Sequence, residues 1–369
     1  MQRFLYVGSF SYSGAEGITI CKFDSETGEV KPEKLASQRT NAGSLTVKDG
    51  YLYSTDEQII TCPSGGGGVL CFETDSENGE LKEKSHIFTM AANTSGITFD
   101  KTGNYMVVTH FAIGMPTIKV VQDENNNWHS EKVFPDTITN LYRLNEDGTP
   151  GKLCDVIHHS AETAPKPSFI HKAFLAPDGS CFAYGNLGAD RIGFFKIDYK
   201  EEKLVPLFET LCQDGSGPRH LVFHPTLPVL YLNYERKGAV SKFRWSEENC
   251  IWEEDTVLPV GEAELGPRDN QSEILIDEKG QCLYDVMRGL GYLYVMEIDQ
   301  DTGSLRCIQS IETDSKAVRG AAFSPDGKYL LLACNDTENV VSYRIMKNGK
   351  LERAAVSEKI THPAAIAFL

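Results

Sequence analysis

Arginine, histidine and glutamate recur at matching places along this chain, and the most distinctive example is the sequence GPRH at residues 217–220. It contains Arg219, and Glu235 follows at the end of the next apolar run. A carboxylate or a neutral imidazole can take a proton from water, and a guanidinium can stabilise the charge that a carbonyl oxygen gains during hydrolysis. These residue types therefore suit hydrolytic chemistry, provided that the fold brings them together.

The elements that would position these side chains form a repeat. Each copy has an apolar run, a tight turn of Pro, Asp or Gly, a β-rich run and a third alternating run, which is the pattern of an antiparallel meander. The residues that mark equivalent points, mostly about 50 residues apart, are Tyr6, Tyr53, Tyr105, Tyr184, Tyr231, Tyr284 and Leu331. This spacing is typical of a four-stranded propeller blade.

The two ends of the chain share one repeat. Residues 4–24 match the second and third runs and have no first run, whereas residues 362–369 match a first run alone. We therefore predict an all-β, seven-bladed β-propeller that forms a single domain of residues 1–369, closed by pairing of the N- and C-terminal strands. The long interval after Tyr105 predicts an insertion at about 111–138, on the rim that carries the reactive residues, where it narrows the channel mouth or contacts another subunit.

Strand geometry predicts where the polar side chains gather. If the first strand of each blade lines the channel, residues just before it and just after the second strand share one rim. By blade, this rim collects His171 with Asn186, Arg219 and His220 with Glu235, Glu273 with Arg288, Arg319 with Asn335, and Ser95 with His110. The opposite rim collects turn formers, so we expect the chemistry at one end of the channel.

Composition limits the partners and the compartment. The formal charge of −16 argues against nucleic acids and anionic membranes as partners, and it means that an anionic ligand needs a local basic cluster. No apolar run reaches the roughly 18 residues of a membrane span. The ten cysteines are scattered without a CxxC pair, which favours reduced core residues in a cytoplasmic protein. We expect no metal and no cofactor, and a monomer or weak homo-oligomer.

Several motifs together resemble a known family. They are GPRH, the FHP turn at 223–225, the run from Tyr231 to Glu235, NLGADRI at 186–192 and LYVGSF at 5–10. These resemble the seven-bladed lactonase family, which includes bacterial 6-phosphogluconolactonase and the fungal carboxymuconate lactonizing enzyme. The resemblance covers essentially the whole chain and is strongest from residue 171 to residue 345.

The resemblance implies a set of site residues and a reaction. By motif position the catalytic residues are His171, Arg219, Glu235 and Arg288. Rim position adds as substrate-binding candidates Arg319, Glu273, His220, Asn186 and His110. The implied reaction is hydrolysis of an anionic sugar lactone, with Glu235 or His171 as the base and the two arginines on the carbonyl oxygen and the phosphate.

Other interpretations of the same residues remain open. Arg219 and Glu235 can form an ion pair that only fixes the inner hairpin. His220 points away from Arg219 if the strand alternates regularly, which favours a packing role. Arg319 and Glu273 either line the pocket or join neighbouring blades. For the whole chain the alternatives are a muconate-type cyclase and a non-catalytic propeller that binds a ligand or a protein.

Overall fold

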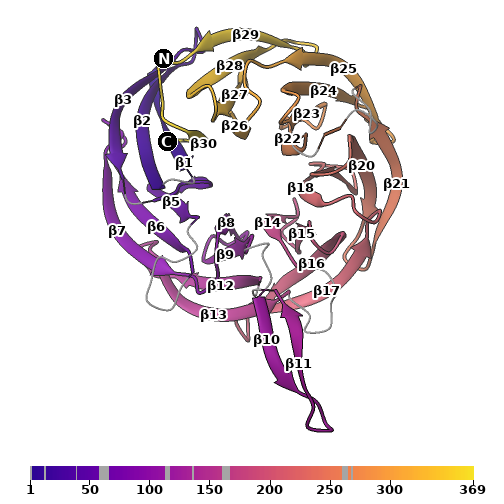
Figure 1. Cartoon of the computed structure of the whole chain (residues 1–369). Coiled ribbons are helices and arrows are strands. Elements are labelled where there is room, and N and C mark those ends of the chain that lie inside the picture. The colour runs from indigo at the N-terminus through magenta and orange to yellow at the C-terminus, as the bar shows by residue number, and fades with distance from the viewer. Residues whose placement is uncertain are drawn as a thin grey trace.

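The strands of the chain form a ring of blades. The computed structural model describes residues 2–11, 14–38, 40–57, 66–112, 117–134, 137–159, 167–259, 265–266 and 269–369, and these residues form thirty β-strands and no helix. The described strands make seven four-stranded sheets and one separate hairpin. Figure 1 shows the sheets standing as blades around a central channel, which confirms the predicted seven-bladed propeller.

Each blade is an antiparallel meander that runs from the channel to the outside. In order from blade 1 to blade 7, the first strands, which line the channel, are β30 (Pro363–Phe368), β4 (Leu45–Lys48), β8 (Thr94–Phe99), β14 (Ile170–Leu175), β18 (Pro218–Phe223), β22 (Gln271–Ile276) and β26 (Val318–Phe323). The second strands are β1 (Gln2–Ser11), β5 (Tyr51–Asp56), β9 (Tyr105–His110), β15 (Phe182–Asn186), β19 (Val229–Tyr234), β23 (Cys282–Met287) and β27 (Tyr329–Cys334). The third strands are β2 (Gly14–Asp24), β6 (Gly68–Thr74), β12 (Ile138–Leu144), β16 (Arg191–Asp198), β20 (Ala239–Trp245), β24 (Tyr292–Ile298) and β28 (Asn339–Ile345). The outer strands are β3 (Val30–Ser37), β7 (Leu81–Phe88), β13 (Pro150–His158), β17 (Lys203–Leu211), β21 (Cys250–Val257), β25 (Leu305–Glu312) and β29 (Leu351–Val356).

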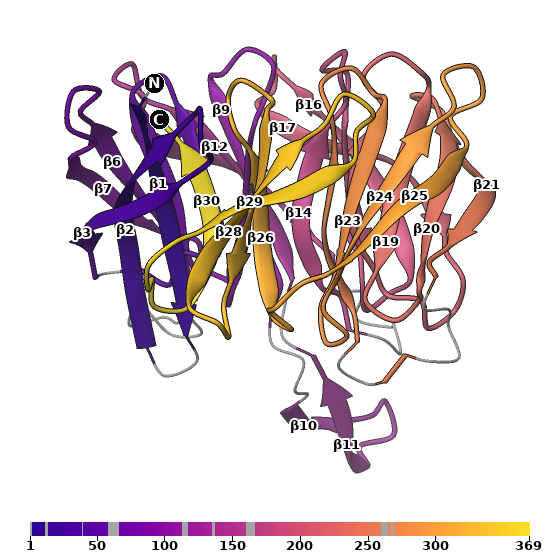
Figure 2. The same ribbon diagram turned by 90° about the horizontal axis from the view of Figure 1, so that it is seen from above.

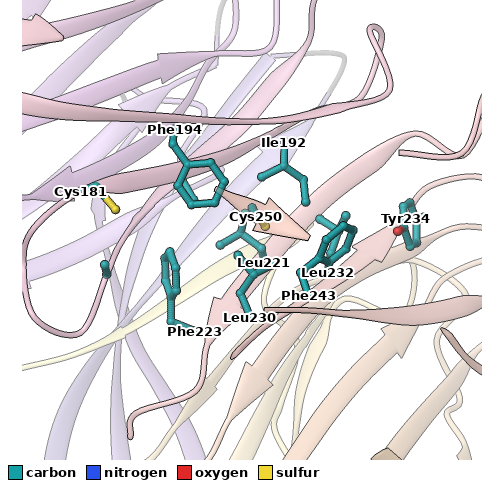
Figure 3. Close-up of a cluster of buried hydrophobic side chains, with 12 residues drawn as sticks. Cys181, Ile192, Phe194, Leu221, Phe223, Leu230, Leu232, Tyr234, Phe243 and Cys250 are labelled. Carbon is teal, nitrogen blue, oxygen red and sulfur yellow. The ribbon is translucent and has the colours of Figure 1, made fainter. Parts of the chain in front are cut away.

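Burial explains the two kinds of apolar run in the sequence. The second strands β9, β19, β23 and β27 are buried at every residue, because neighbouring blades cover both of their faces. A strand buried on both faces reads as a continuous apolar run, whereas an outer strand such as β29 is mostly exposed. Figure 3 shows one core between blades, where Phe194 packs with Leu221 and Leu232. Each such buried side chain contributes about 1.5–3 kcal/mol.

The tyrosines that mark the repeat also connect successive blades. Four of these tyrosines are buried in second strands, and the hydroxyl of each donates a hydrogen bond to a glycine carbonyl in the turn between the third and outer strands of the next blade. The four pairs of this kind are Tyr6 with Gly79 (3.0 Å), Tyr53 with Gly148 (2.6 Å), Tyr231 with Gly303 (2.7 Å) and Tyr284 with Gly349 (3.0 Å). The repeat in the sequence therefore records a repeated contact between blades.

The ring closes as the sequence predicts. Strand β30 pairs with β1 in an antiparallel register that runs from Leu5 opposite Phe368 to Ser9 opposite Pro363. Figure 1 shows both chain ends in this blade. Closure covers the edge that β1 would otherwise expose, which removes a site for pairing with other chains.

A hairpin projects from blade 3, within the insertion predicted at 111–138. It consists of β10 (Thr117–Gln122) and β11 (Trp128–Val133), and it leaves the blade between β9 and β12. Figures 1 and 2 show that it extends outward from one rim and does not cover the channel. Phe111 at its base instead reaches the site, where its ring centroid lies 4.4 Å from that of His171.

Other sequence expectations concern cysteines and membranes. The nine cysteines in the described residues are free thiols, and six of them are buried. The tenth, Cys62, lies outside the described residues. Within the described part of the chain, no helix is long and apolar enough to cross a membrane.

Candidate active site

Seven equivalent backbone positions surround one mouth of the channel. At each, a residue at the end of a second strand donates its N–H to a carbonyl ahead of the first strand of the same blade. The pairs are Phe10 with His362, Glu57 with Asn41, Phe111 with Asn93, Leu187 with Phe169, Glu235 with Gly217, Arg288 with Asn270, and Asn335 with Ala317. We call these seven donor residues the mouth ring; its charged members are Glu57, Glu235 and Arg288.

The first strands carry a second set of polar residues, on β-bulges. In blade 5, Pro218 pairs with Tyr234 and Leu221 pairs with Leu232. Between these two pairs, β18 therefore contains one residue more than β19. The same one-residue shift occurs in blades 1, 3, 4, 6 and 7. A bulge interrupts the alternation of a strand and re-aims its side chains. Consecutive residues of a first strand can therefore both face the channel.

The bulge overturns the expectation for His220. Regular alternation predicts that His220 points away from Arg219, but both residues line the same cavity, and Arg219 Nη1 lies 3.3 Å from His220 Nδ1. The bulge leaves the His220 N–H without a strand partner, and the Asn233 side chain accepts it at 3.0 Å. Satisfying this buried donor fixes the bulge and both side chains.

A cavity of about 130 Å³ lies at this mouth. Its charged lining consists of Glu57, Lys172, Arg219, Glu273 and Arg319, and His171 lies among them. They come from blades 2, 4, 5, 6 and 7, so only the closed ring brings them together. The cavity is a local concentration of positive charge in an acidic protein.

Glu235 is the centre of an ion network beside the cavity. One oxygen, Oε1, lies 3.1 Å from Arg219 Nε, 3.3 Å from Arg288 Nη2 and 3.5 Å from His171 Nε2. Burial acts to raise the pKa of Glu235, but the hydrogen bond from His171 and the charges of Arg219 and Arg288 outweigh it and hold that pKa well below its ordinary value. Glu235 is therefore ionised at neutral pH and a weak base. The structure brings together the four residues that the family resemblance implies.

His171 is neutral in this environment. Burial and the nearby Arg219 charge lower the pKa of His171 to about 3. A neutral imidazole that approaches an ionised carboxylate through Nε2 carries its proton on that atom. Nδ1 then keeps its lone pair, so the Glu235–His171 pair has the arrangement of an oriented imidazole base.

Arg219 is held on two sides. Its Nε contacts Glu235, and its Nη1 donates to the carbonyl of Ser272 and lies 3.8 Å from Glu273 Oε1. Among the described residues no hydrogen bond from Nη2 is found. His220 Nδ1 lies 3.3 Å from the other Glu273 oxygen, so Glu273 also fixes this histidine. Arg219 is thereby presented to the cavity in one orientation, with a donor remaining.

Arg288 and Arg319 come from blades 6 and 7, the two blades that follow blade 5. Arg288 is part of the Glu235 network, and burial together with the charge of Arg219 lowers the pKa of its guanidinium to about 10. Arg319 lines the cavity, and its guanidinium lies 4.9 Å from the centroid of the Phe10 ring. Arg288 remains charged at neutral pH.

Two candidate residues are not brought into the cavity. Asn186 is the last residue of β15, and its side chain holds the following loop by accepting from the N–H groups of Phe169 (3.1 Å) and Ala189 (3.2 Å). His110 is the last residue of β9; it is fully buried, with Nδ1 2.8 Å from the carbonyl of Ile138. Each of them lies one residue before the mouth-ring residue of its own blade.

Two pocket residues were missed by sequence analysis, Glu57 and Lys172. A signal for Glu57 was present, because Glu57 follows Tyr53 by four residues, as Glu235 follows Tyr231. Lys172 had no such signal, since a bulge is needed for it to face the cavity beside His171. No group of three or more His, Cys, Asp or Glu side chains suited to a metal ion is found in the described ranges.

Comparison with known proteins agrees with this architecture. The model of the family "Lactonase, 7-bladed beta-propeller" matches residues 4–368. The 6-phosphogluconolactonase of Bacillus subtilis is 23% identical over an alignment that covers 99% of this chain and 97% of that protein. The 6-phosphogluconolactonase of Formosa agariphila is 24% identical, with 95% of this chain and 94% of that protein covered. The periplasmic gluconolactonase of Pseudomonas aeruginosa superposes with a TM-score of 0.85 at 21% identity, covering 100% and 99% of the two chains. This protein therefore belongs to the seven-bladed β-propeller lactonase family.

Proposed function

We propose that this protein is a lactonase that hydrolyses a sugar lactone, and that its substrate carries a phosphate, as in 6-phosphogluconolactone. The observation that carries the proposal is the network of Glu235, His171, Arg219 and Arg288 at the mouth of a cationic cavity. The names of the relatives from Bacillus subtilis and Formosa agariphila support the same substrate.

In the proposed reaction His171 is the base. Its Nδ1 takes a proton from water, whose oxygen attacks the lactone carbonyl. Glu235 orients the imidazole and stabilises the imidazolium that forms, a role that suits a carboxylate whose own basicity is suppressed by its partners. The pKa values of both candidate bases are lowered, so the choice between them rests on contacts. Oε1 of Glu235 is shared by Arg219, Arg288 and His171, whereas Nδ1 of His171 has no hydrogen-bond partner among the described residues, which favours His171.

Arg219 stabilises the oxyanion. Because Glu235 and Ser272 hold its Nε and Nη1, Nη2 can donate to the carbonyl oxygen without a further loss of side-chain freedom. Arg288, Arg319 and Lys172 supply positive charge for the phosphate. Lys172 makes no hydrogen bond or ion pair among the described residues, which leaves its ammonium group available.

The proposal is tested with a panel of sugar lactones, with and without phosphate, assayed for acid release. We expect the parent protein to prefer the phosphorylated lactone, and His171→Asn to lower kcat by roughly a hundredfold or more. Arg219→Lys keeps the positive charge but loses the planar guanidinium group with its several fixed N–H donors, so it should also lower kcat. A parent protein that is inert on the whole panel would contradict the proposal and favour a non-catalytic propeller.

We also propose that the protein is cytoplasmic and a monomer or weak homo-oligomer. The nine free cysteines support a reducing compartment. Cell fractionation and the elution volume of the purified protein check these two points.

A further inference from the structure

We propose that Glu57 is a second catalytic residue, the acid that protonates the ring oxygen as the lactone opens. This role rests on the proposed lactonase function, because opening a lactone leaves an alkoxide on the former ring oxygen, and that oxygen needs a proton. Glu57 lies in none of the family motifs, although it follows Tyr53 by four residues as Glu235 follows Tyr231. The inference comes from its place, its contacts and its environment.

The place of Glu57 is equivalent to that of Glu235 and Arg288. All three belong to the mouth ring and make the same backbone hydrogen bond, which for Glu57 runs to Asn41 at 3.0 Å. Glu57 follows β5 in blade 2, and Figure 1 shows β5 across the channel from β18 of blade 5. Glu57 and Arg219 line the same cavity, so a carboxyl group faces the proposed oxyanion site from the opposite wall.

Among the residues that the structure describes, the carboxyl group of Glu57 has no hydrogen-bond or ion-pair partner. Among the described residues, no hydrogen bond and no ion pair within 4 Å reaches it, whereas Glu235 and Glu273 are both in ion pairs. The chain makes space for it with a glycine: a Cβ added at Gly43 would lie 1.7 Å from Glu57 Oε1. A half-buried carboxyl that lines the cavity and has no partner among the described residues is available to a ligand.

The environment keeps a proton on this group near neutral pH. Burial raises the pKa of Glu57 to about 7, and the more distant charges of Arg319 and Arg219 only partly oppose it. Asp285 has a pKa raised by burial to the same value, but Asn233 and Gln271 enclose it, and it does not line the cavity. The pKa of Glu235 is lowered and the pKa of Glu57 is raised. Glu235 is therefore suited to orient the base, and Glu57 is suited to act as the acid.

The proton transfers balance over the whole reaction. The water oxygen forms a bond to the carbonyl carbon as His171 takes one proton from that water. The bond between the carbonyl carbon and the ring oxygen then breaks, its electron pair stays on the ring oxygen, and that oxygen takes the proton of Glu57. His171 returns its proton to Glu57 through solvent, and the product is a hydroxy acid that ionises in water.

The test is the pH dependence of kcat in Glu57→Gln, with Glu77→Gln as the control. Glu77 is exposed in a turn of the same blade, so its change should leave the profile unchanged. A general acid acts in its protonated form, so the parent rate should fall as the pH rises through about 7, after subtraction of spontaneous hydrolysis. Glu57→Gln should lower kcat by roughly a hundredfold and abolish this fall.

A second variant guards against a folding defect. Gly43→Ala keeps the acid but pushes its carboxyl group out of position, so it should lower kcat while leaving the unfolding temperature close to that of the parent. If the parent is active and Glu57→Gln keeps the parent rate or the parent profile, the role of Glu57 is wrong and the lactonase function stands. If the parent opens no lactone, both proposals fail together.

Discussion

At the scale of single residues, the three carboxylates around the cavity have the same chemistry but different surroundings. Glu235 lies among Arg219, Arg288 and His171, and Glu273 lies between Arg219 and His220, so both are ionised. Glu57 meets no cation within 4 Å among the described residues, and burial decides its protonation. Neighbours that are distant in the sequence therefore decide that Glu235 and Glu273 are ion-pair partners and that Glu57 is the proposed acid.

The buried ion network predicts a pH-dependent stability. Replacing Glu235 by Gln removes the carboxylate that Arg288 contacts and leaves Arg219 with Glu273 alone, so the free energy of unfolding should fall by roughly 3–5 kcal/mol at pH 7. The folded-state pKa of Glu235 lies below its ordinary value of 4.5, so the stability that its ionised form contributes is present above that pH and lost as the pH falls below it. Urea unfolding of parent and variant from pH 7 to pH 3 measures this difference, which should shrink towards low pH. A difference that is independent of pH would contradict the network.

At the scale of elements, the bulges in the first strands of six blades decide which side chains reach the cavity. In blade 5 the bulge gives Arg219 and His220 to one cavity, and in blade 4 it does the same for His171 and Lys172. A regular strand would present only one residue of each pair. The bulges therefore double the number of functional side chains that a short inner strand can present.

The bulge of blade 5 should depend on Asn233, which accepts the His220 N–H. Asn233→Leu keeps a similar volume but leaves that buried donor unsatisfied, so the free energy of unfolding should fall by roughly 1–3 kcal/mol. Because the bulge orients Arg219, kcat should fall as well. Asn249→Leu, at an exposed turn of the same blade, is the control and should change stability by about 0.5 kcal/mol or less. Equal effects of the two variants would show that Asn233 does not support the bulge.

At the scale of the whole molecule, the ring is held by contacts between neighbouring blades. Seven apolar clusters, such as that of Phe194 with Leu221, alternate with the seven blades. The tyrosine hydroxyls add directed contacts from one blade to the turn of the next. Since the charged residues of the cavity come from five blades, the geometry of the site depends on closure of the entire ring.

Closure should therefore be essential for stability. A chain that ends at His362 lacks β30, exposes the edge of β1 and loses the packing of Ile366 and Ala367, so its unfolding temperature should fall by roughly 10 °C or more. Replacing residues 117–133 by a short Gly-Ser turn is the control. No described residue of that hairpin belongs to an apolar cluster, so this deletion should leave the unfolding temperature unchanged. Scanning calorimetry compares the two, and equal stability of the parent and the C-terminal truncation would refute the closure argument.

Local patterns in the sequence were sufficient for the architecture. The repeat length indicates four-stranded blades, the phase of the two chain ends predicts closure through residues 362–369, and strand reversal places His171, Arg219 and Glu235 at one rim. These inferences succeed because a blade is built from consecutive residues, so its hydrogen bonds and its alternation are visible within about 50 residues.

Only the tertiary structure decided the details of the site. A bulge is a one-residue shift between paired strands, which regular alternation does not reveal, and it moved His220 and Lys172 into the cavity. The residue at which each second strand ends determines which residue belongs to the mouth ring. Glu57 belongs to it, whereas His110 and Asn186 each lie one residue before a member of the ring. The protonation of Glu57 and Glu235 depends on burial and on charges from other blades. The repeat determined the ring and the end of the channel that carries the chemistry, whereas packing between distant segments determined which side chains meet there and in which charge state.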